Sequence, residues 1–400
     1  MSYLIFCSFE VGGQPFKMAD ALNRHGVRTY YFSSAGPVTG HDSTSFHFGD
    51  PTHDWDLTPS AGSGPASSRK LAAVLKRIRE THGIDGCLAT GGQAHVLGRA
   101  GIPYTYWSYG SDLDQYCFAR NRNPLRHYSL WRRLKRLIRF YLQVRPRARA
   151  SIGGAESLLI APYQSDAIAQ VTSNRSFAFL PHVLHVESYE VLKAQKDANR
   201  RQVCSEIDAD SFFFSATRHV WTEHFRDWAD LKGNDVPIRA FSQFVTKRAG
   251  GCGTKLVLVR KGPDFAASDA LARELGIGNR VVWVDEMPRE KLQAYYSGAT
   301  ICFGQFVTPA ITYAALEPLA FGTPCVSWFD RGDLDVPLYE ILPPLRNTRS
   351  PEEIAEIMCQ AVEGGDNYAA ECAAGWSWVR DNCSEENFAV CFAELFESAR

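Results

Sequence analysis

Short apolar runs alternate with helical stripes from the start of the chain. Residues 4–7 form an apolar run that is typical of a buried strand. Residues 18–22 carry a helical stripe that Gly26 ends, and residues 27–32 have the pattern of a second strand. A strand, a helix and a strand in this order predict a βαβ unit and therefore a parallel sheet.

The same alternation continues through the first half of the chain. Residues 34–68 are rich in Ser, Gly, Pro, His and Asp, and we expect long loops there. The further elements predicted in this half are a helix at 68–81, strands at 85–89, 104–108 and 157–160, and a helix from Ser165.

A second series of strands and helices begins after residues 182–205, which we expect to connect two domains. The predicted strands are 212–214, 255–259, 281–284, 300–303 and 325–327, and the predicted helices are 235–247, 266–275, 289–297 and 313–321. A chain of 400 residues is also long for one hydrophobic core. We therefore predict an α/β protein with two Rossmann-like domains.

Composition excludes several classes of protein. The 43 basic and 44 acidic residues nearly cancel, so a global preference for nucleic acid is not indicated. The 11 cysteines form no Cys-x-x-Cys pair, which argues against a disulfide framework or a zinc knuckle and favours buried, reduced thiols. No segment has the pattern of a signal peptide or a membrane span. We expect a cytoplasmic protein, at most peripheral at the inner face of the membrane.

Three short motifs follow one another in the second half. They are Thr217-Arg218, the Lys-Gly-Asn-Asp segment from Lys232 to Asp235, and the Leu-Glu step at Glu317, followed by Gly-Thr-Pro at 322–324. Each motif alone is common, but the ordered set, interleaved with apolar strands, is specific. It resembles the retaining, family-4-like glycosyltransferases (glycosyl transferases group 1), which have the GT-B architecture.

The resemblance implies a role for each of these residues. Arg218 and Lys232 would neutralise the diphosphate of a nucleotide diphospho-sugar, and Glu317 would bind the ribose hydroxyls. Fixed cations stabilise the charge of a departing nucleoside diphosphate, and a carboxylate accepts hydroxyl hydrogen bonds. Backbone groups of 284–287, which include Glu286, would contact the base.

Backbone N–H groups provide further expected contacts to the donor. Those of Thr312 and Tyr313 lie at a predicted helix start, where anionic oxygens bind favourably. Gly12 and Gly13 occur where the family places a glycine loop against the donor phosphate, although a double glycine also forms an ordinary turn.

Two positions depart from the family pattern. Tyr109 precedes Gly-Ser-Asp where the family commonly has His, and Asp112 in this step either contacts the sugar or acceptor or caps a turn. Pro309 stands where a carboxylate commonly contacts the sugar ring. Gln305-Phe306 resembles a variant branch that also lacks this carboxylate. The donor sugar is therefore less predictable than the nucleotide diphosphate.

The resemblance also implies the organisation and mechanism of the whole chain. Residues 1–190 would form the acceptor-binding domain and 200–375 the donor-binding domain, facing a central cleft. A helix at 376–400 would pack back on the N-terminal domain. Transfer of a hexose-type sugar from a UDP or GDP donor would retain the anomeric configuration, without a cofactor or a metal ion. We do not expect a metal to bind at three Asp-x-Asp pairs that occupy unrelated predicted loops; they are Asp112/Asp114, Asp208/Asp210 and Asp333/Asp335.

The segment 119–149 differs from the rest of the chain. It is rich in arginine, with no acidic residue between Asp114 and Glu156, and apolar residues form a helical stripe within it. One interpretation is a solvated helix face. The other is a surface that binds an anionic membrane or an anionic or lipid-linked acceptor. Such acceptors would place the protein in the synthesis of cell-surface glycans or glycoconjugates.

Two other functions remain as alternatives. An NAD-dependent oxidoreductase or a nucleotide-sugar epimerase would carry Gly-x-Gly-x-x-Gly in the first strand–helix turn, where this chain has Gly-Gly-Gln-Pro at 12–15. A non-catalytic nucleotide-sugar-binding protein is the second alternative, because the common Glu and His are absent at 309 and 109.

Overall fold

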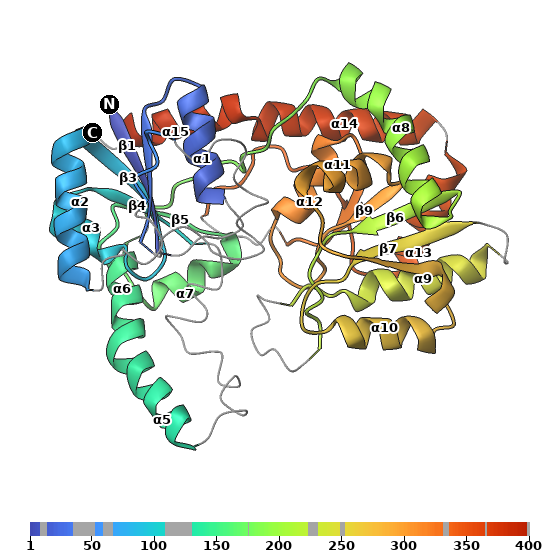
Figure 1. The fold of residues 1–400 in the computed structure, drawn as a ribbon, viewed down its shortest axis with the longest axis horizontal. Coiled ribbons are helices and arrows are strands. Elements are labelled where there is room, and N and C mark those ends of the chain that lie inside the picture. The colour runs from blue at the N-terminus through green and yellow to red at the C-terminus, as the bar shows by residue number, and fades with distance from the viewer. Residues whose placement is uncertain are drawn as a thin grey trace. The chain divides into compact units, whose positions relative to one another are not determined.

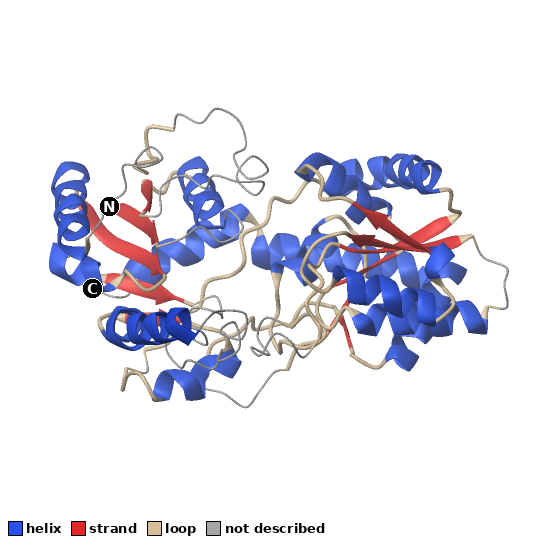
Figure 2. Ribbon diagram, turned by 60° about the horizontal axis from the view of Figure 1, so that its bottom comes forward, coloured by secondary structure: helices blue, strands red, loops and turns tan. Residues whose placement is uncertain are grey.

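The chain forms two compact units in a computed structural model. The structure describes residues 1–8, 14–34, 53–58, 67–108, 130–174, 176–222, 231–248, 253–330, 336–364 and 366–397. Unit 1 comprises Met1–Val183, Gly332–Leu338 and Glu385–Arg400, and unit 2 comprises Leu184–Arg331 and Tyr339–Ser384. Each unit is built around one parallel β-sheet (Figures 1 and 2).

Unit 1 holds a five-stranded sheet in the order β2-β1-β3-β4-β5. Its strands are β1 (Ser2–Cys7), β2 (Thr29–Ser33), β3 (Ile84–Thr90), β4 (Tyr104–Trp107) and β5 (Ser157–Leu159). Its helices are α1 (Gln14–Arg24), α2 (Ser68–His82), α3 (His95–Ala100), α5 (Leu130–Arg139), the π-helix η1 (Phe140–Val144), α6 (Arg145–Gly153), the 3₁₀ helix η2 (Pro162–Gln164), α7 (Ser165–Ala169) and α15 (Glu385–Glu397).

Both faces of the unit 1 sheet are buried, as is usual for a parallel sheet. Leu4 and Phe6 of β1 point into a core that also contains buried residues of α2, α3 and α6. Tyr3 and Ile5 point to the opposite face, where they join buried residues of α1 and α15. Because side chains alternate along a strand, one apolar run supplies both cores.

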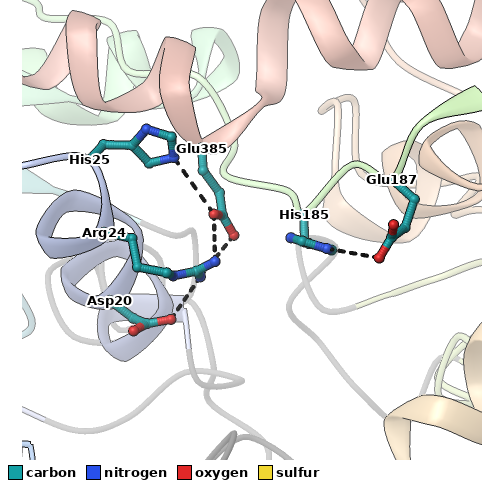
Figure 3. Close-up of polar contacts among 6 residues, drawn as sticks. All are labelled: Asp20, Arg24, His25, His185, Glu187 and Glu385. Atoms are coloured by element: carbon teal, nitrogen blue, oxygen red, sulfur yellow. Dashed lines mark hydrogen bonds and ion pairs between the residues drawn. The ribbon is translucent and has the colours of Figure 1, made fainter.

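Helix α15 packs in unit 1 although it follows unit 2 in the sequence. The rings of Tyr3 and Phe392 meet edge to face with centroids 5.4 Å apart. At the start of α15, Glu385 forms an ion pair with Arg24 of α1 at 2.8 Å, and Arg24 also contacts Asp20 at 2.7 Å (Figure 3). Aromatic packing against β1 and a charge network with α1 therefore both hold α15 in unit 1.

Unit 2 holds a six-stranded sheet in the order β11-β10-β9-β6-β7-β8. Its strands are β6 (Ser211–Ser215), β7 (Thr254–Val259), β8 (Val281–Val284), β9 (Ile301–Phe303), β10 (Cys325–Ser327) and β11 (Arg346–Asn347). Its helices are α8 (Tyr189–Ile207), α9 (Asp235–Lys247), α10 (Phe265–Glu274), the 3₁₀ helix η3 (Gly278–Arg280), α11 (Arg289–Gly298), α12 (Tyr313–Ala320), α13 (Pro351–Glu363) and α14 (Asp366–Cys383).

Aromatic residues of β6 fill both faces of the unit 2 sheet. Phe213 packs against Phe244 of α9, with ring centroids 5.2 Å apart. Phe214 points to the other face and packs against Tyr295 of α11 at 5.2 Å. Strand β6 is therefore held between α9 on one face of the sheet and α11 on the other.

The predicted class, an α/β protein with two parallel sheets, is confirmed. Two segments differ from the expectation. Residues 182–205 are not a simple connection, because most of them form α8, which belongs to unit 2. In place of one helix at 376–400, α14 belongs to unit 2 and α15 to unit 1, with the helical structure interrupted at Ser384. Among the described residues, no helix combines the length and the apolar composition that crossing a membrane requires.

Candidate functional site

The order of the strands in unit 2 marks one place where a ligand is expected. The chain runs outward from β6 through β7 to β8 and then returns to the other side of β6 as β9. The loops after β6 and β9 therefore leave the same edge of the sheet in opposite directions. Such a switch point, at the carboxyl ends of parallel strands, is where sheets of this kind bind ligands. Arg218 lies in the loop after β6.

Lys232 connects the two loops at the switch point. Its backbone N–H donates to the carbonyl of Val220 at 2.6 Å, and its carbonyl accepts from the N–H of Phe306 at 2.9 Å. Its side-chain Nζ donates to Oε1 of the buried Gln305 at 3.0 Å. The chain thus fixes the backbone of Lys232, and Gln305 holds its ammonium group at this edge of the sheet.

Asn234 holds the loop that carries Arg218. Its Oδ1 accepts from the N–H of Val220 at 3.0 Å, and its Nδ2 donates to Oγ1 of Thr217 at 3.1 Å. These contacts lie on both sides of the exposed Arg218 in the sequence. The predicted phosphate-binding pair, Arg218 and Lys232, is therefore carried by two segments that hydrogen-bond to each other.

Gly233 allows the segment of Lys232 to approach the loop after β9 closely. Its backbone has a φ of +68°, in the left-handed region that favours glycine. A Cβ atom at this position would lie 3.0 Å from Cβ of Phe306 and 3.2 Å from Cγ2 of Val307. The glycine after Lys232 is thus required by both the turn and the packing.

Glu317 lies on α12 and contacts two residues of α11. Its Oε1 is 3.6 Å from Nη1 of Arg289, and its Oε2 accepts from the hydroxyl of Tyr296 at 3.2 Å. Burial, followed by the negative charge of Glu317, raises the pKa of Tyr296, so this hydroxyl stays protonated and acts as a donor. The Glu317 side chain remains 17% exposed, which leaves it accessible to a ligand.

Thr312 and Tyr313 form the start of α12, as the sequence predicts. Thr312 has extended backbone angles and its carbonyl accepts from the N–H groups of Ala315 and Leu316. Its Oγ1 is buried and has no hydrogen-bond partner among the described residues. The helix begins after the segment that contains Pro309. Its N-terminus provides a partial positive charge next to an unsatisfied hydroxyl oxygen.

Glu286 follows β8 and is tied to the loop after β7. Its Oε2 pairs with Nζ of Lys261 at 2.7 Å, and its side chain is half exposed. The carbonyl of Lys261 accepts from the N–H of His219, next to Arg218, at 2.7 Å. Hydrogen bonds therefore connect the loops after β6, β7 and β8 at one edge of the sheet.

His219 is a buried support beneath this edge. Its Nδ1 lies 2.8 Å from Oγ of Ser268. The side chain has 0% exposure, and burial lowers its pKa to about 4, against the opposing influence of the Val259 carbonyl and the Asp264 carboxylate. Asp264 in turn accepts from the N–H groups of Trp221 and Thr222 at 2.7 and 2.9 Å. The neutral imidazole of His219 and the carboxylate of Asp264 thus hold the residues that follow Arg218 in place.

The buried His219 predicts a pH dependence of stability. An unfolded histidine has a pKa of about 6.5. Between pH 6.5 and pH 4 the unfolded chain takes up a proton that the folded chain does not, so the free energy of unfolding falls by up to about 3 kcal/mol. Above pH 6.5 neither state is protonated and this contribution disappears. We expect the stability difference between the parent and His219→Asn to shrink as pH falls through this window, as measured by urea unfolding. A difference that is constant from pH 7 to pH 4.5 would contradict this.

Several predicted positions lie outside the described residues. They are Gly12, Gly13, Tyr109 and Asp112, together with the Asp-x-Asp pairs Asp112/Asp114 and Asp333/Asp335. In the third pair, Asp208 ends α8 with a φ of +52°, and Asp210 accepts from the N–H of Gly253 at 3.2 Å. Within the described part of the chain, no three His, Cys, Asp or Glu side chains are grouped as metal ligands would be.

The structure adds four residues that sequence reasoning did not assign to the site. Asn234 and Gln305 hold the segments of Arg218 and Lys232, and Arg289 and Tyr296 contact Glu317. Asn234 lies within the Lys-Gly-Asn-Asp motif, so its position was a usable signal. The contacts of Arg289 and Tyr296 depend on how α11 packs against α12, which no motif in the sequence records.

Sequence comparisons connect parts of the chain to curated glycosyltransferases. No family model matches the chain. It is 31% identical over 103 residues to a D-inositol 3-phosphate glycosyltransferase of Acidothermus cellulolyticus. The aligned residues are 24% of this chain and 23% of that protein. A protein of the same name from Mycobacteroides abscessus is 29% identical over 159 residues, which covers 37% of this chain and 34% of that protein. The matches thus span only about a quarter to a third of these relatives.

Structural comparisons extend over the whole chain. A sucrose-phosphate synthase from Thermosynechococcus elongatus has a TM-score of 0.63 at 15% identity, covering 100% of this chain and 99% of that one. The Anabaena protein HepE in complex with UDP-glucose has a TM-score of 0.61 at 14% identity, covering 99% of both chains. At such identities the likeness shows the fold. The chain therefore has the GT-B fold, and parts of its sequence are similar to curated glycosyltransferases.

Proposed function

We propose that the protein transfers a sugar from a nucleotide diphospho-sugar to an acceptor. The observation that carries the proposal is the placement of Lys232 between the loops after β6 and β9, hydrogen-bonded to the segment of Arg218. A cation held at a strand-order switch point is suited to an anionic ligand. The solved HepE structure has UDP-glucose bound, which supports a donor of this class.

Three groups of residues at the carboxyl edge of the unit 2 sheet would bind the diphosphate, the ribose and the base of the donor. Arg218 and Lys232 face the diphosphate, and the start of α12 at Thr312 and Tyr313 adds backbone donors to the same oxygens. Arg289 orients the carboxylate of Glu317, which accepts hydrogen bonds from the ribose hydroxyls. The residues after β8, including Glu286, contact the base through the backbone. We propose a UDP or GDP donor and no further cofactor.

The chemical step would break the bond between the anomeric carbon and the diphosphate oxygen. The bonding electrons pass to the nucleoside diphosphate, whose added charge Arg218 and Lys232 stabilise. A hydroxyl oxygen of the acceptor then bonds to the anomeric carbon on the same face, and the departing phosphate takes its proton. This route retains the anomeric configuration and needs no metal ion. Asp112 is proposed to contact the sugar or acceptor.

The acceptor is proposed to be a sugar or a lipid-linked, anionic molecule in glycan or glycoconjugate synthesis. Pro309 stands where related enzymes commonly have a carboxylate, so a hexose-type donor sugar would be recognised without that contact.

Incubation with UDP-, GDP- and ADP-sugars, scored by release of free nucleoside diphosphate, tests the function. Release with at least one donor is expected. Tight binding of a donor without any turnover, across acceptors, would instead favour a nucleotide-sugar-binding protein.

Arg289 gives a prediction that separates nucleotide binding from turnover. Its guanidinium lies 3.6 Å from Oε1 of Glu317 and orients that carboxylate. We expect Arg289→Gln to weaken binding of the nucleoside diphosphate about tenfold, which corresponds to about 1.4 kcal/mol, with a smaller change in kcat. Arg248→Gln, which removes an ion pair with Glu363 at 3.7 Å elsewhere in unit 2, is the control. Equal affinities of both variants, measured by calorimetry, would exclude this role for Arg289.

A further inference from the structure

One helical segment carries half of the exposed large hydrophobic side chains found among the described residues. Of ten such side chains, five fall between residues 131 and 142; they are Trp131, Leu134, Ile138, Tyr141 and Leu142. Trp131 exposes 65% of its surface and Leu142 exposes 73%. Isolated exposed apolar residues need no explanation, but a cluster on one element indicates an interaction surface.

The five residues share one face of the segment. Trp131, Leu134, Ile138 and Tyr141 follow one another at spacings of three and four, and Leu142 lies four residues after Ile138. These spacings place side chains on one side of a helix. Helix α5 and the π-helix η1 are continuous over this range. We call these five residues the apolar face.

Positive charge borders the apolar face. Nζ of Lys135 lies 5.8 Å from the ring centroid of Trp131, and the guanidinium of Arg145 lies 5.8 Å from that of Tyr141. The whole segment 130–149 has no acidic residue and eight basic residues, which are Arg132, Arg133, Lys135, Arg136, Arg139, Arg145, Arg147 and Arg149. A helix face that is only solvated would not combine this charge with exposed Trp and Leu.

The segment is anchored to unit 1 at its carboxyl end. Ala148 and Ile152 of α6 are buried in the core of the unit, and Oγ of Ser151 accepts from the N–H of His95 at 3.0 Å. Pro146 cannot donate a backbone hydrogen bond, and the N–H of Arg145 donates to the carbonyl of Phe140 in a wide π-type turn. The helix therefore continues past the proline, and α5 extends away from the sheet of unit 1 (Figure 1).

We propose that this segment docks the protein on the surface of an anionic lipid bilayer. The helix would lie in the plane of the interface, with the apolar face among the upper acyl chains and the basic residues at the lipid phosphates. Trp131 and Tyr141 suit the headgroup level, where their rings are apolar and their polar atoms stay hydrated. A soluble anionic ligand would use the arginines but would have no need of Trp131 or Leu142. The proposal does not depend on the sugar-transfer activity.

Sedimentation with vesicles tests both parts of the surface. We expect the full chain to bind vesicles of phosphatidylcholine mixed with phosphatidylglycerol at least about tenfold more tightly than phosphatidylcholine alone. Replacing Trp131 and Leu142 with Gln should weaken binding to the mixed vesicles by at least about tenfold. The matched control replaces Ile341 and Val390, which are 69% and 52% exposed elsewhere, and should bind like the parent.

Charge is tested with a second pair of variants. Lys135→Gln with Arg139→Gln should weaken binding to the mixed vesicles, whereas Arg69→Gln with Lys70→Gln, exposed on α2, should not. Thermal unfolding checks that each variant is folded. As an independent readout, brominated phosphatidylcholine in the mixed vesicles should quench part of the tryptophan fluorescence of the parent, and Trp131→Phe should remove that part. Equal binding to both vesicle types, or quenching unchanged in Trp131→Phe, would overturn the proposal.

Discussion

Replacement of Lys232 by Met is expected to lower kcat for sugar transfer by a factor of about 100 to 1,000. Gln305 holds the ammonium group at the switch point, and two hydrogen bonds hold the backbone of Lys232. There it would stabilise charge that develops on the departing diphosphate, and removal of one such fixed donor costs about this much in other enzymes. Because the interaction strengthens in the transition state, we expect kcat to fall more than the affinity for the donor.

The control for this experiment is a lysine on the same sheet but away from its carboxyl edge. Lys255 lies at the start of β7, where its Nζ donates to the carbonyl of Asn279 at 3.1 Å. Lys255→Met should keep the turnover of the parent within a factor of about two, because it removes one exposed hydrogen bond of modest net value. Steady-state release of nucleoside diphosphate measures both variants. A Lys232→Met protein with the kcat of the parent would show that Lys232 does not act on the leaving group.

Replacement of Glu317 by Ala is expected to weaken binding of the nucleoside diphosphate about a hundredfold. Two hydrogen bonds from ribose hydroxyls to a carboxylate are together worth about 3 kcal/mol. The carboxylate is held by Tyr296 and Arg289 and is 17% exposed, so it can accept further bonds. Isothermal titration with UDP and GDP measures the effect.

A second ligand separates this contact from any structural effect of the substitution. The parent should bind 2′-deoxyuridine diphosphate more weakly than uridine diphosphate, because one hydroxyl partner of Glu317 is absent. Glu317→Gln retains the size of the side chain but is a weaker acceptor, so its discrimination between the two ligands should largely disappear. If Glu317→Gln kept the discrimination of the parent, the ribose would be bound elsewhere.

The fold was predictable wherever local pattern and packing agree. Helix α9 has the predicted bounds, because its apolar residues have helical spacing and its ends carry Asp235 and Lys247 in the order that the helix dipole favours. Strand β7 corresponds to a run of alternating Leu and Val. Helix α8 was not predicted, since only Leu192, Val203 and Cys204 are buried along it and its apolar periodicity is weak.

The candidate site was predictable only in part. The motifs named Arg218, Lys232 and Glu317, and the structure connects the first two through the contacts of Val220 and Asn234. The partners of Glu317 could not be predicted, because they come from a different helix and depend on tertiary packing. Similarly, the basic composition of 130–149 left two interpretations open, and only the exposure of the apolar face favours one of them.

The central claim is that unit 2 binds a nucleoside diphosphate at the carboxyl edge of β6 and β9. A crystal structure with UDP, or with the nucleotide of whichever donor is turned over, tests it most directly. We predict diphosphate oxygens within about 3 Å of Nζ of Lys232 and ribose hydroxyls at the same distance from the carboxylate of Glu317. A nucleotide bound without contact to either residue would contradict the claim.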